Sequence, residues 1–178
     1  YGGDVVGGDE SDSSSRTLGQ GGRINFDLSH DLVLRSNRQA RTGLPVVDLL
    51  RGGAIGYGGG TIRNVITASL GLSGYGMGLQ LDGQWHGKSY VTTGTAATPN
   101  RLQFDDRAIA GVRFFANLGP LLPDRDWARG MRVTVQVNNL FDSRQRVTDM
   151  GGATPQRYQP FLLDPLGRSI SLGLRKAF

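Results

Sequence analysis

The sequence predicts an all-β protein: an antiparallel, up-and-down segment of a transmembrane β-barrel with about six strands. Apolar and polar residues alternate with a period of two through six segments of the chain. Several segments extend over 12 to 17 residues, whereas soluble strands average about 5 or 6 residues and a tilted membrane-crossing strand needs about 9 to 11. The long connections between the segments also fall on one side of the predicted sheet.

The elements follow in order from the pattern. Residues 1–22 are rich in Gly, Ser and Asp, and we predict a flexible segment there. Within residues 23–178, the predicted strands occupy residues 23–35, 61–73, 77–91, 102–118, 131–142 and 169–178. A turn at Ser73-Gly74-Tyr75-Gly76 joins the second and third of them.

The connections are unequal in length. If consecutive strands are antiparallel, the two 25-residue connections (36–60 and 143–167) and the 9-residue connection (92–100) lie on the same side. Outer-membrane barrels have long outside loops that alternate with shorter periplasmic turns. Connections of 25 residues are uncommon in a soluble sandwich with so few strands.

The alternation assigns two faces to the strands. In residues 131–142, for example, Val133, Val135 and Val137 alternate with polar residues. We expect the apolar face, which has no Lys, Glu or Arg except Lys176, to contact lipid and the polar face to line a wet lumen. The candidate lumen-facing residues are Gln80, Asp82, Gln84, His86, Arg132, Gln136 and Asn138.

A lipid-exposed sheet must close into a barrel, because every backbone N–H and C=O group in hydrocarbon needs a partner within the protein. The smallest membrane barrels have about eight strands. We therefore expect the six strands to be the end of a larger barrel that includes earlier strands.

Composition excludes several function classes. The chain has no Cys, which removes disulfide frameworks, zinc fingers and Cys proteases. The net charge is +5, but the basic residues are nearly all Arg and are scattered singly, so we predict no binding to nucleic acid.

We also predict no catalytic chemistry, no metal and no cofactor. His30 and His86 lack the spacing of a metal motif. The Gly-rich run at residues 52–60 has no following Lys-Ser/Thr and opens no helix, so it is no phosphate loop. Asp105 and Asp106 are neighbours on a strand and point to opposite faces.

The C-terminal third contains more specific motifs. They are an Asn-Leu-Phe-Asp stretch, a Gly-Arg pair and a final alternating strand that ends in an aromatic residue. The residues of the first two motifs are Asn138, Asn139, Leu140, Phe141, Asp142, Gly167 and Arg168. Together the three motifs resemble the end of a TonB-dependent outer-membrane receptor.

The resemblance implies a barrel of roughly 22 strands in the outer membrane of a Gram-negative bacterium, closed around a plug. It implies active uptake of a siderophore or another scarce nutrient. The implied partners are outer-membrane lipid, a small nutrient ligand, and the TonB complex, which would act through an N-terminal plug that nothing in this chain matches. The ligand-binding residues remain unassigned.

The resemblance also implies an assembly signal in the last strand, which the barrel-assembly machinery would capture. Its residues are Ile170, Leu172, Leu174 and Phe178 on one face, with Gly173 on the lumen side. Lys176 departs from the apolar pattern, but near a strand end its stem can extend toward the interface.

Alternatives remain open at two points. The Arg residues of the long loops (Arg38, Arg41, Arg51, Arg144, Arg146 and Arg157) suit either capture of an anionic ligand or ordinary solvent and headgroup contacts. The whole chain could instead be a small self-contained outer-membrane barrel with a structural or adhesive role, or a soluble carbohydrate-binding β-sandwich.

Overall fold

The computed structural model describes residues 4–18, 21–54, 60–95 and 97–177. Its strands are β1 (Asp4–Leu18), β2 (Gly22–Arg38), β3 (Val47–Asp48), β4 (Asn64–Gly74), β5 (Met77–His86), β6 (Ser89–Gly94), β7 (Pro99–Phe104), β8 (Arg107–Asn117), β9 (Met131–Asn138), β10 (Val147–Thr148) and β11 (Ser169–Lys176). The short helical elements are α1 (Leu118–Leu121), η1 (Asp126–Ala128), η2 (Gln156–Tyr158) and α2 (Pro160–Leu163).

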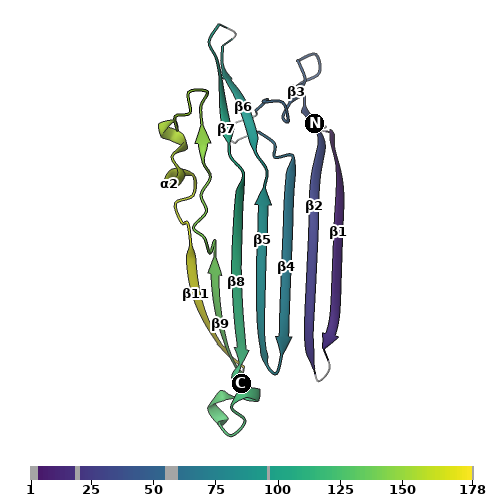
Figure 1. Ribbon diagram of the computed structural model, residues 1–178, viewed down its shortest axis with the longest axis vertical. Helices are drawn as coiled ribbons and strands as arrows, with labels where there is room; N and C mark the ends of the chain where they lie inside the picture. Colours follow the sequence, from purple (N-terminus) through teal and green to yellow (C-terminus); the bar gives the residue numbers. More distant parts are fainter. Residues whose placement is uncertain (1–3, 19–20, 55–59, 96, 178) are drawn as a thin grey trace.

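The main sheet is an antiparallel meander in the order β1-β2-β4-β5-β8-β9-β11, with β3 paired to the end of β2 (Figure 1). This arrangement confirms the prediction of an all-β, antiparallel fold. Among the described residues, β1 and β11 each pair with one neighbour only, so the sheet is open at both edges.

The connections confirm the predicted asymmetry. The segments that join β2 to β4, β6 to β7 and β9 to β11 lie at the upper end of the sheet in Figure 1, and the tighter turns lie at the lower end. At the lower end, Tyr75 and Gly76 link β4 to β5 with φ values of 50° and 80°. Two consecutive positive φ values are typical of the two-residue hairpin turn whose twist matches that of the strands.

The prediction for the N-terminal segment was wrong for residues 4–18. They form β1, which pairs with β2 from Asp4↔Asn37 to Leu18↔Gly22. The pairing joins backbone N–H and C=O groups along the free edge of β2, so it does not require an alternating side-chain pattern. Residues 1–3 and 19–20 lie outside the described part.

Two of the predicted strands are each divided into two. The segment at 77–91 forms β5 and β6, and the segment at 102–118 forms β7 and β8. The upper pieces belong to a separate three-stranded sheet in the order β10-β7-β6. Pairing stops at His86↔Arg107 and resumes at Ser89↔Phe104 with unchanged register, so the alternation continues through the break and does not reveal it.

The cross-strand register aligns the apolar residues into rows. Residues directly opposite each other in paired strands share a face, and one row consists of Ile24, Leu72, Leu79, Phe114, Val135 and Leu172. Five such rows run from Met77↔Ala116 to Trp85↔Ala108. At two residues per row, they extend about 27 Å along the strands.

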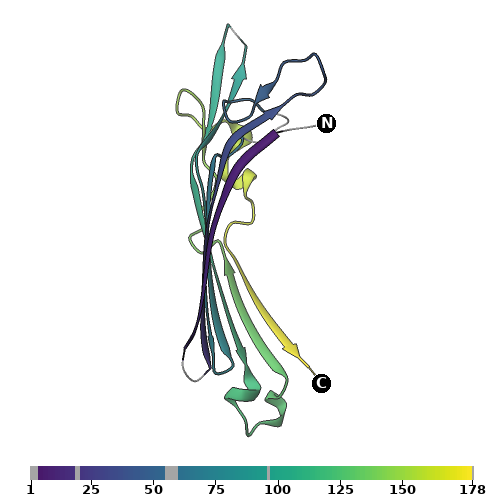
Figure 2. The ribbon, with the colours of Figure 1, turned by 90° about the vertical axis from the view of Figure 1, so that its right-hand side faces the viewer.

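No described part of the chain covers this apolar face. Figure 2 shows the lower part of the main sheet as a single curved layer. Large apolar side chains of the face are solvent-exposed, for example Phe114 at 40% and Leu172 at 76%. We use the name outer face for the surface that carries these rows, and polar face for the opposite surface.

Tight packing occurs instead at the upper end. Val91 and Leu102 are cross-strand partners in the small sheet and are buried, as is Val147 of β10. Phe104 also makes an edge-to-face contact with Tyr158, with ring centroids 5.8 Å apart. The small sheet therefore has its own core, which holds the long connections in place above the main sheet.

No helix in the described residues has the length and apolar character needed to cross a membrane.

Candidate functional site

The polar face of the main sheet carries all seven residues that the sequence assigns to the lumen side. Gln80 lies opposite Arg113, and Arg113 lies opposite Gln136, so the even positions of β5 and β9 share one face. This face is opposite the one that carries Leu79, Leu81 and Val135. The assigned residues are Gln80, Asp82, Gln84, His86, Arg132, Gln136 and Asn138.

Hydrogen bonds connect several of these side chains across the strands. Arg113 Nε donates to Gln136 Oε1 at 3.1 Å, Gln136 donates to Asn138, and Asn138 donates to Ser169 of β11. Cross-strand polar pairs of this kind contribute modestly to sheet stability. They also hold exposed donors and acceptors in a fixed row, as a water-filled surface requires.

Further contacts lie on the same face. Gln80 Nε2 donates to Asp82 Oδ1 at 2.9 Å. Arg132 donates to Asn117 at 2.8 Å and lies over the Phe115 ring, 4.4 Å from its centroid. In the described residues, no hydrogen bond involves the side chains of Gln84 or His86, so the structure assigns them a face but no partner.

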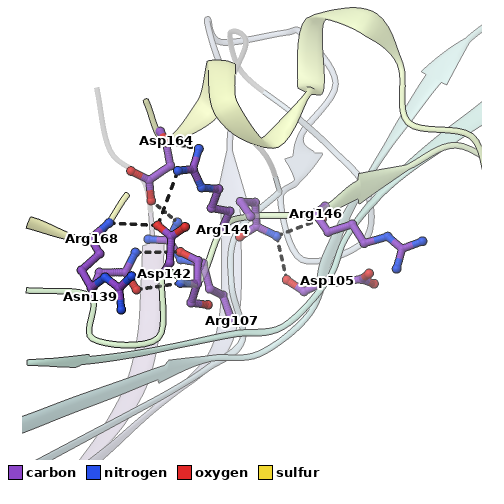
Figure 3. A network of polar contacts seen from close by, with 10 residues as sticks. Asp105, Arg107, Asn139, Asp142, Arg144, Arg146, Asp164 and Arg168 are labelled. Atoms are coloured by element: carbon purple, nitrogen blue, oxygen red, sulfur yellow. Dashed lines mark hydrogen bonds and ion pairs between the residues drawn. The ribbon is translucent and has the colours of Figure 1, made fainter. Parts of the chain in front are cut away.

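The motif residues after β9 form a compact polar cluster, shown in Figure 3, which we call the motif cluster. Asn139 is buried and has φ of 50°, which Asn tolerates better than most residues. Its side chain accepts a hydrogen bond from the Ser143 N–H at 2.8 Å and donates to the Ser143 carbonyl at 2.9 Å. The amide therefore closes the turn in which β9 ends.

Asp142 connects this turn to the start of β11 (Figure 3). Its Oδ1 accepts a hydrogen bond from the Arg168 N–H at 2.9 Å and lies 3.4 Å from the Arg144 guanidinium. The hydrogen bond from the Arg168 backbone, with the Arg144 charge, holds the pKa of the Asp142 carboxyl below its usual value. The Arg168 guanidinium donates to the Leu140 carbonyl, so both parts of Arg168 bind the turn.

A buried ion pair extends the cluster to β8. Arg107 Nη1 lies 3.0 Å from Asp164 Oδ2, and both side chains are largely buried. Arg144 donates to the Asp164 carbonyl. The ion pair between Arg107 and Asp164 holds the segment after α2 against the upper end of β8. The cluster therefore joins β8, β9 and β11.

The residues of β11 that the resemblance suggests as an assembly signal lie at the open edge. Ile170, Leu172 and Leu174 are 72%, 76% and 65% exposed, on the outer face. Gly173 lies opposite Thr134 on the polar face. Lys176 donates to the Trp127 carbonyl at the lower end. Phe178 lies outside the described residues.

A hollow of about 680 Å³ lies at the upper end of the sheet, and two of its lining residues, Asn64 and Trp85, belong to the outer face. It is lined by residues from four separate segments, among them Arg51, Arg63, Asn64, Trp85, Lys88 and Asp106. Trp85 Nε1 donates to Asp106 Oδ2 at 3.3 Å, and Lys88 lies 3.8 Å from Asp106 Oδ1. We call it the rim hollow.

Sequence reasoning did not find the rim hollow. In the sequence, Arg51 is one of several Arg residues in the long loops, and Asp106 is a neighbour of Asp105 that points to the opposite face. The available signal was that Trp85 and Asp106 both carry the parity of the outer face and stand at the strand ends that face the long loops. Of the remaining loop cations, Arg144 belongs to the motif cluster.

His30 lies in β2, directly opposite Glu10 of β1. Its Nε2 lies 3.2 Å from Asn64 Oδ1, at the upper end of the outer face. Within the described ranges, no group of three or more His, Cys, Asp or Glu residues is placed to hold a metal ion.

No protein-family model, curated protein or solved structure matches the chain.

The lowered pKa of Asp142 predicts a pH-dependent contribution to stability. A carboxyl whose folded-state pKa is depressed stabilises the fold above its ordinary pKa of 3.8, and the contribution is lost as the pH falls through the folded-state pKa. We expect Asp142→Asn to lower the free energy of unfolding at pH 7 and to narrow its difference from the wild type at acidic pH. Urea unfolding followed by tryptophan fluorescence measures this, and a difference that does not change with pH would contradict it.

The close packing around Gly167 predicts that a larger side chain there lowers the stability of the same cluster. A Cβ atom at Gly167 would overlap Asp142 Oδ1 and the Arg144 guanidinium, and φ is 56°. We expect Gly167→Ala to lower the free energy of unfolding by more than about 1 kcal/mol. Gly152→Ala is the matched control, because Gly152 also has a positive φ, of 79°, but has open space around it. Equal losses in the two variants would contradict a role for the contact with Asp142.

Proposed function

We propose that this chain forms part of the wall of an outer-membrane β-barrel of the TonB-dependent receptor class, which takes up a siderophore or another scarce nutrient. The observation that carries the proposal is the uncovered outer face, with five rows of apolar side chains opposite a hydrogen-bonded polar face. The rows extend about 27 Å along the strands, comparable with the apolar band of about 25 Å around outer-membrane barrels.

The residues at the upper end of the outer face support one orientation of the sheet in the membrane. The upper end of the outer face changes from apolar rows to His30, Asn64, Trp85 and Asp106, which are polar or amphipathic. Aromatic and polar side chains are typical of the membrane interface. The long connections emerge at this end, where the proposal places the cell exterior.

The two open edges of the main sheet, at β1 and β11, support the proposal that the sheet is part of a larger barrel. In hydrocarbon, the unpaired backbone groups of β1 and β11 would each need a neighbouring strand. The proposal supplies these neighbours as further strands of a barrel of roughly 22 strands, closed around a plug. Substrate capture, coupling to the TonB complex and assembly by the barrel-assembly machinery would belong to that complete barrel.

The motif cluster supports the receptor class in particular. The residues that resemble the end of a TonB-dependent receptor are brought together around Asp142. The cluster sets the path of the chain from β9 to β11, and so determines how the last strand is presented. This is a structural role, and it requires no catalytic chemistry.

One observation favours a second candidate, the small self-contained barrel. β1 adds a strand where the sequence indicated a flexible segment, so seven strands follow one another along the main sheet. The smallest membrane barrels have about eight. A soluble sandwich is less well supported, because no second layer of the described chain covers the outer face.

Two neighbouring substitutions test the assignment of the faces. Val135 lies in the middle rows of the outer face, between Phe114 and Leu172, and Gln136 points to the polar face. We expect Val135→Arg to lower the free energy of unfolding by about 2 to 4 kcal/mol, and Gln136→Arg by much less. The measurement is urea unfolding of the membrane-extracted protein, with heat-modifiable gel migration as evidence of a folded barrel. Equal costs, or a protein that is soluble without detergent, would contradict the proposal.

Uptake distinguishes the two barrel candidates. We expect cells that express the complete protein to accumulate at least one member of a labelled panel of siderophores and other scarce nutrients. The accumulation should disappear in a strain that lacks TonB, because transport through a plugged barrel needs that energy source. A structural or adhesive barrel would give no TonB-dependent accumulation from the panel.

A further inference from the structure

The rim hollow lies at the boundary between the apolar rows and the long connections. Trp85 is the last residue of β5 on the outer face and lies opposite Ala108. Asp106 precedes Ala108 by two residues, so the alternation assigns it to the same face. Asn64 begins β4 on the same face. On the proposed function, which this inference depends on, the rim hollow is therefore at the headgroup level of the outer leaflet.

The charge of the rim hollow is positive. Three basic residues, Arg51, Arg63 and Lys88, line it together with one carboxylate, that of Asp106. The Asp106 carboxylate already has two partners, Trp85 and Lys88. Arg51 lies 3.7 Å from the Asp48 carboxylate, which is not part of the lining. Among the described residues, no hydrogen bond or ion pair involves the exposed Arg63 guanidinium. Guanidinium and ammonium groups in this arrangement are typical ligands of phosphate oxygens.

Residues next to the rim hollow add a further basic side chain and fix the position of the loop that lines it. Tyr90 also lines the rim hollow, and Arg101 lies over its ring at 4.3 Å from the centroid. The connection after β3 is held against β6, because Thr92 N–H donates to the Gly52 carbonyl at 2.8 Å. Gly52 has φ of 85°, and a Cβ there would overlap Thr92 and Tyr90. The loop that carries Arg51 is thus packed against the strand that carries Tyr90.

A separate apolar groove lies on the outer face next to the rim hollow. Its volume is about 250 Å³, and the small residues Ala68, Gly83, Ala108 and Ala110 line it together with Trp85 and Phe141. Trp85 lines both the groove and the rim hollow. A hollow with basic residues beside an apolar groove matches a phosphate headgroup joined to an acyl chain.

We propose that the rim hollow and the groove together form a binding site for one phosphorylated lipid of the outer leaflet. Arg63, Lys88 and Arg51 bind the phosphate oxygens of its headgroup. One acyl chain lies in the groove over Gly83, beside the Trp85 ring. Free inorganic phosphate shares the headgroup chemistry but leaves the groove empty, so the two sources can be separated.

The test measures binding to the purified protein in neutral-detergent micelles. The probes are phosphatidic acid added to the micelles, a lipid with the same acyl chains and a neutral headgroup, and inorganic phosphate. We expect saturable binding of phosphatidic acid alone. In R63Q/K88Q this affinity should fall about 30-fold, because each basic side chain at a membrane surface raises affinity about fivefold.

Three control variants sharpen the test. R125Q/R129Q removes two exposed basic residues from the connection between β8 and β9, at the opposite end of the sheet, and should bind phosphatidic acid like the wild type. R63K/K88R keeps both charges and should also retain binding. G83I fills the groove, since a Cβ at Gly83 meets only the Ala68 carbonyl at 3.9 Å. It should weaken phosphatidic acid binding about tenfold, the loss expected for about two methylene groups.

The outcomes separate failure of this site from failure of the proposed function. Equal binding by R63Q/K88Q and R125Q/R129Q, or binding of inorganic phosphate as tight as that of the lipid, would overturn the lipid site while leaving the barrel intact. Heat-modifiable migration of every variant shows that lost binding is not lost folding. A wild-type protein that dissolves without detergent would overturn the proposed function itself.

Discussion

The uncovered outer face is the constraint on which the rest of the structure depends. Folding normally removes apolar side chains from water at about 25 cal/mol per Å², yet the large apolar residues of this face remain exposed in the chain itself. A sheet with such a face requires an external apolar phase or another protein layer. On the proposed function that phase is hydrocarbon, in which the opposite face would line a wet interior and the backbone edges at β1 and β11 would need neighbouring strands.

The residues of the motif cluster, at the upper end of β9, hold the chain in conformations that an isolated strand would not adopt. Asn139, Asp142 and Gly167 all have positive φ values, which raise the local energy of most residues other than Gly. The hydrogen bonds of Asn139 with Ser143 and of Asp142 with Arg168 offset that cost. Together with the Arg107–Asp164 ion pair, they determine where β11 starts relative to β8 and β9, so the motif residues act through geometry.

The same end of the molecule contains two basic clusters with different roles. In the motif cluster, Arg107 and Arg144 are bound to carboxyl groups of the chain itself. In the rim hollow, Arg51 and Lys88 lie within ion-pair distance of Asp48 and Asp106, whereas Arg63 has no acidic partner within the described ranges. The first arrangement stabilises a turn, whereas the second leaves the Arg63 guanidinium available to a ligand beside an apolar groove.

The sequence alone determined the two faces of the sheet, because paired residues in antiparallel strands keep the same parity, and the assignment of Val135 or Gln136 needs no coordinates. It also determined the turn at Tyr75-Gly76. It did not reveal β1, because an edge strand can pair through its backbone without any side-chain pattern. It did not reveal the break after His86, because two unpaired residues on each strand leave the alternation intact. Only the tertiary structure brought Arg51, Arg63, Lys88 and Asp106 into one hollow, since they come from four segments whose meeting depends on how the loops pack over the strand ends.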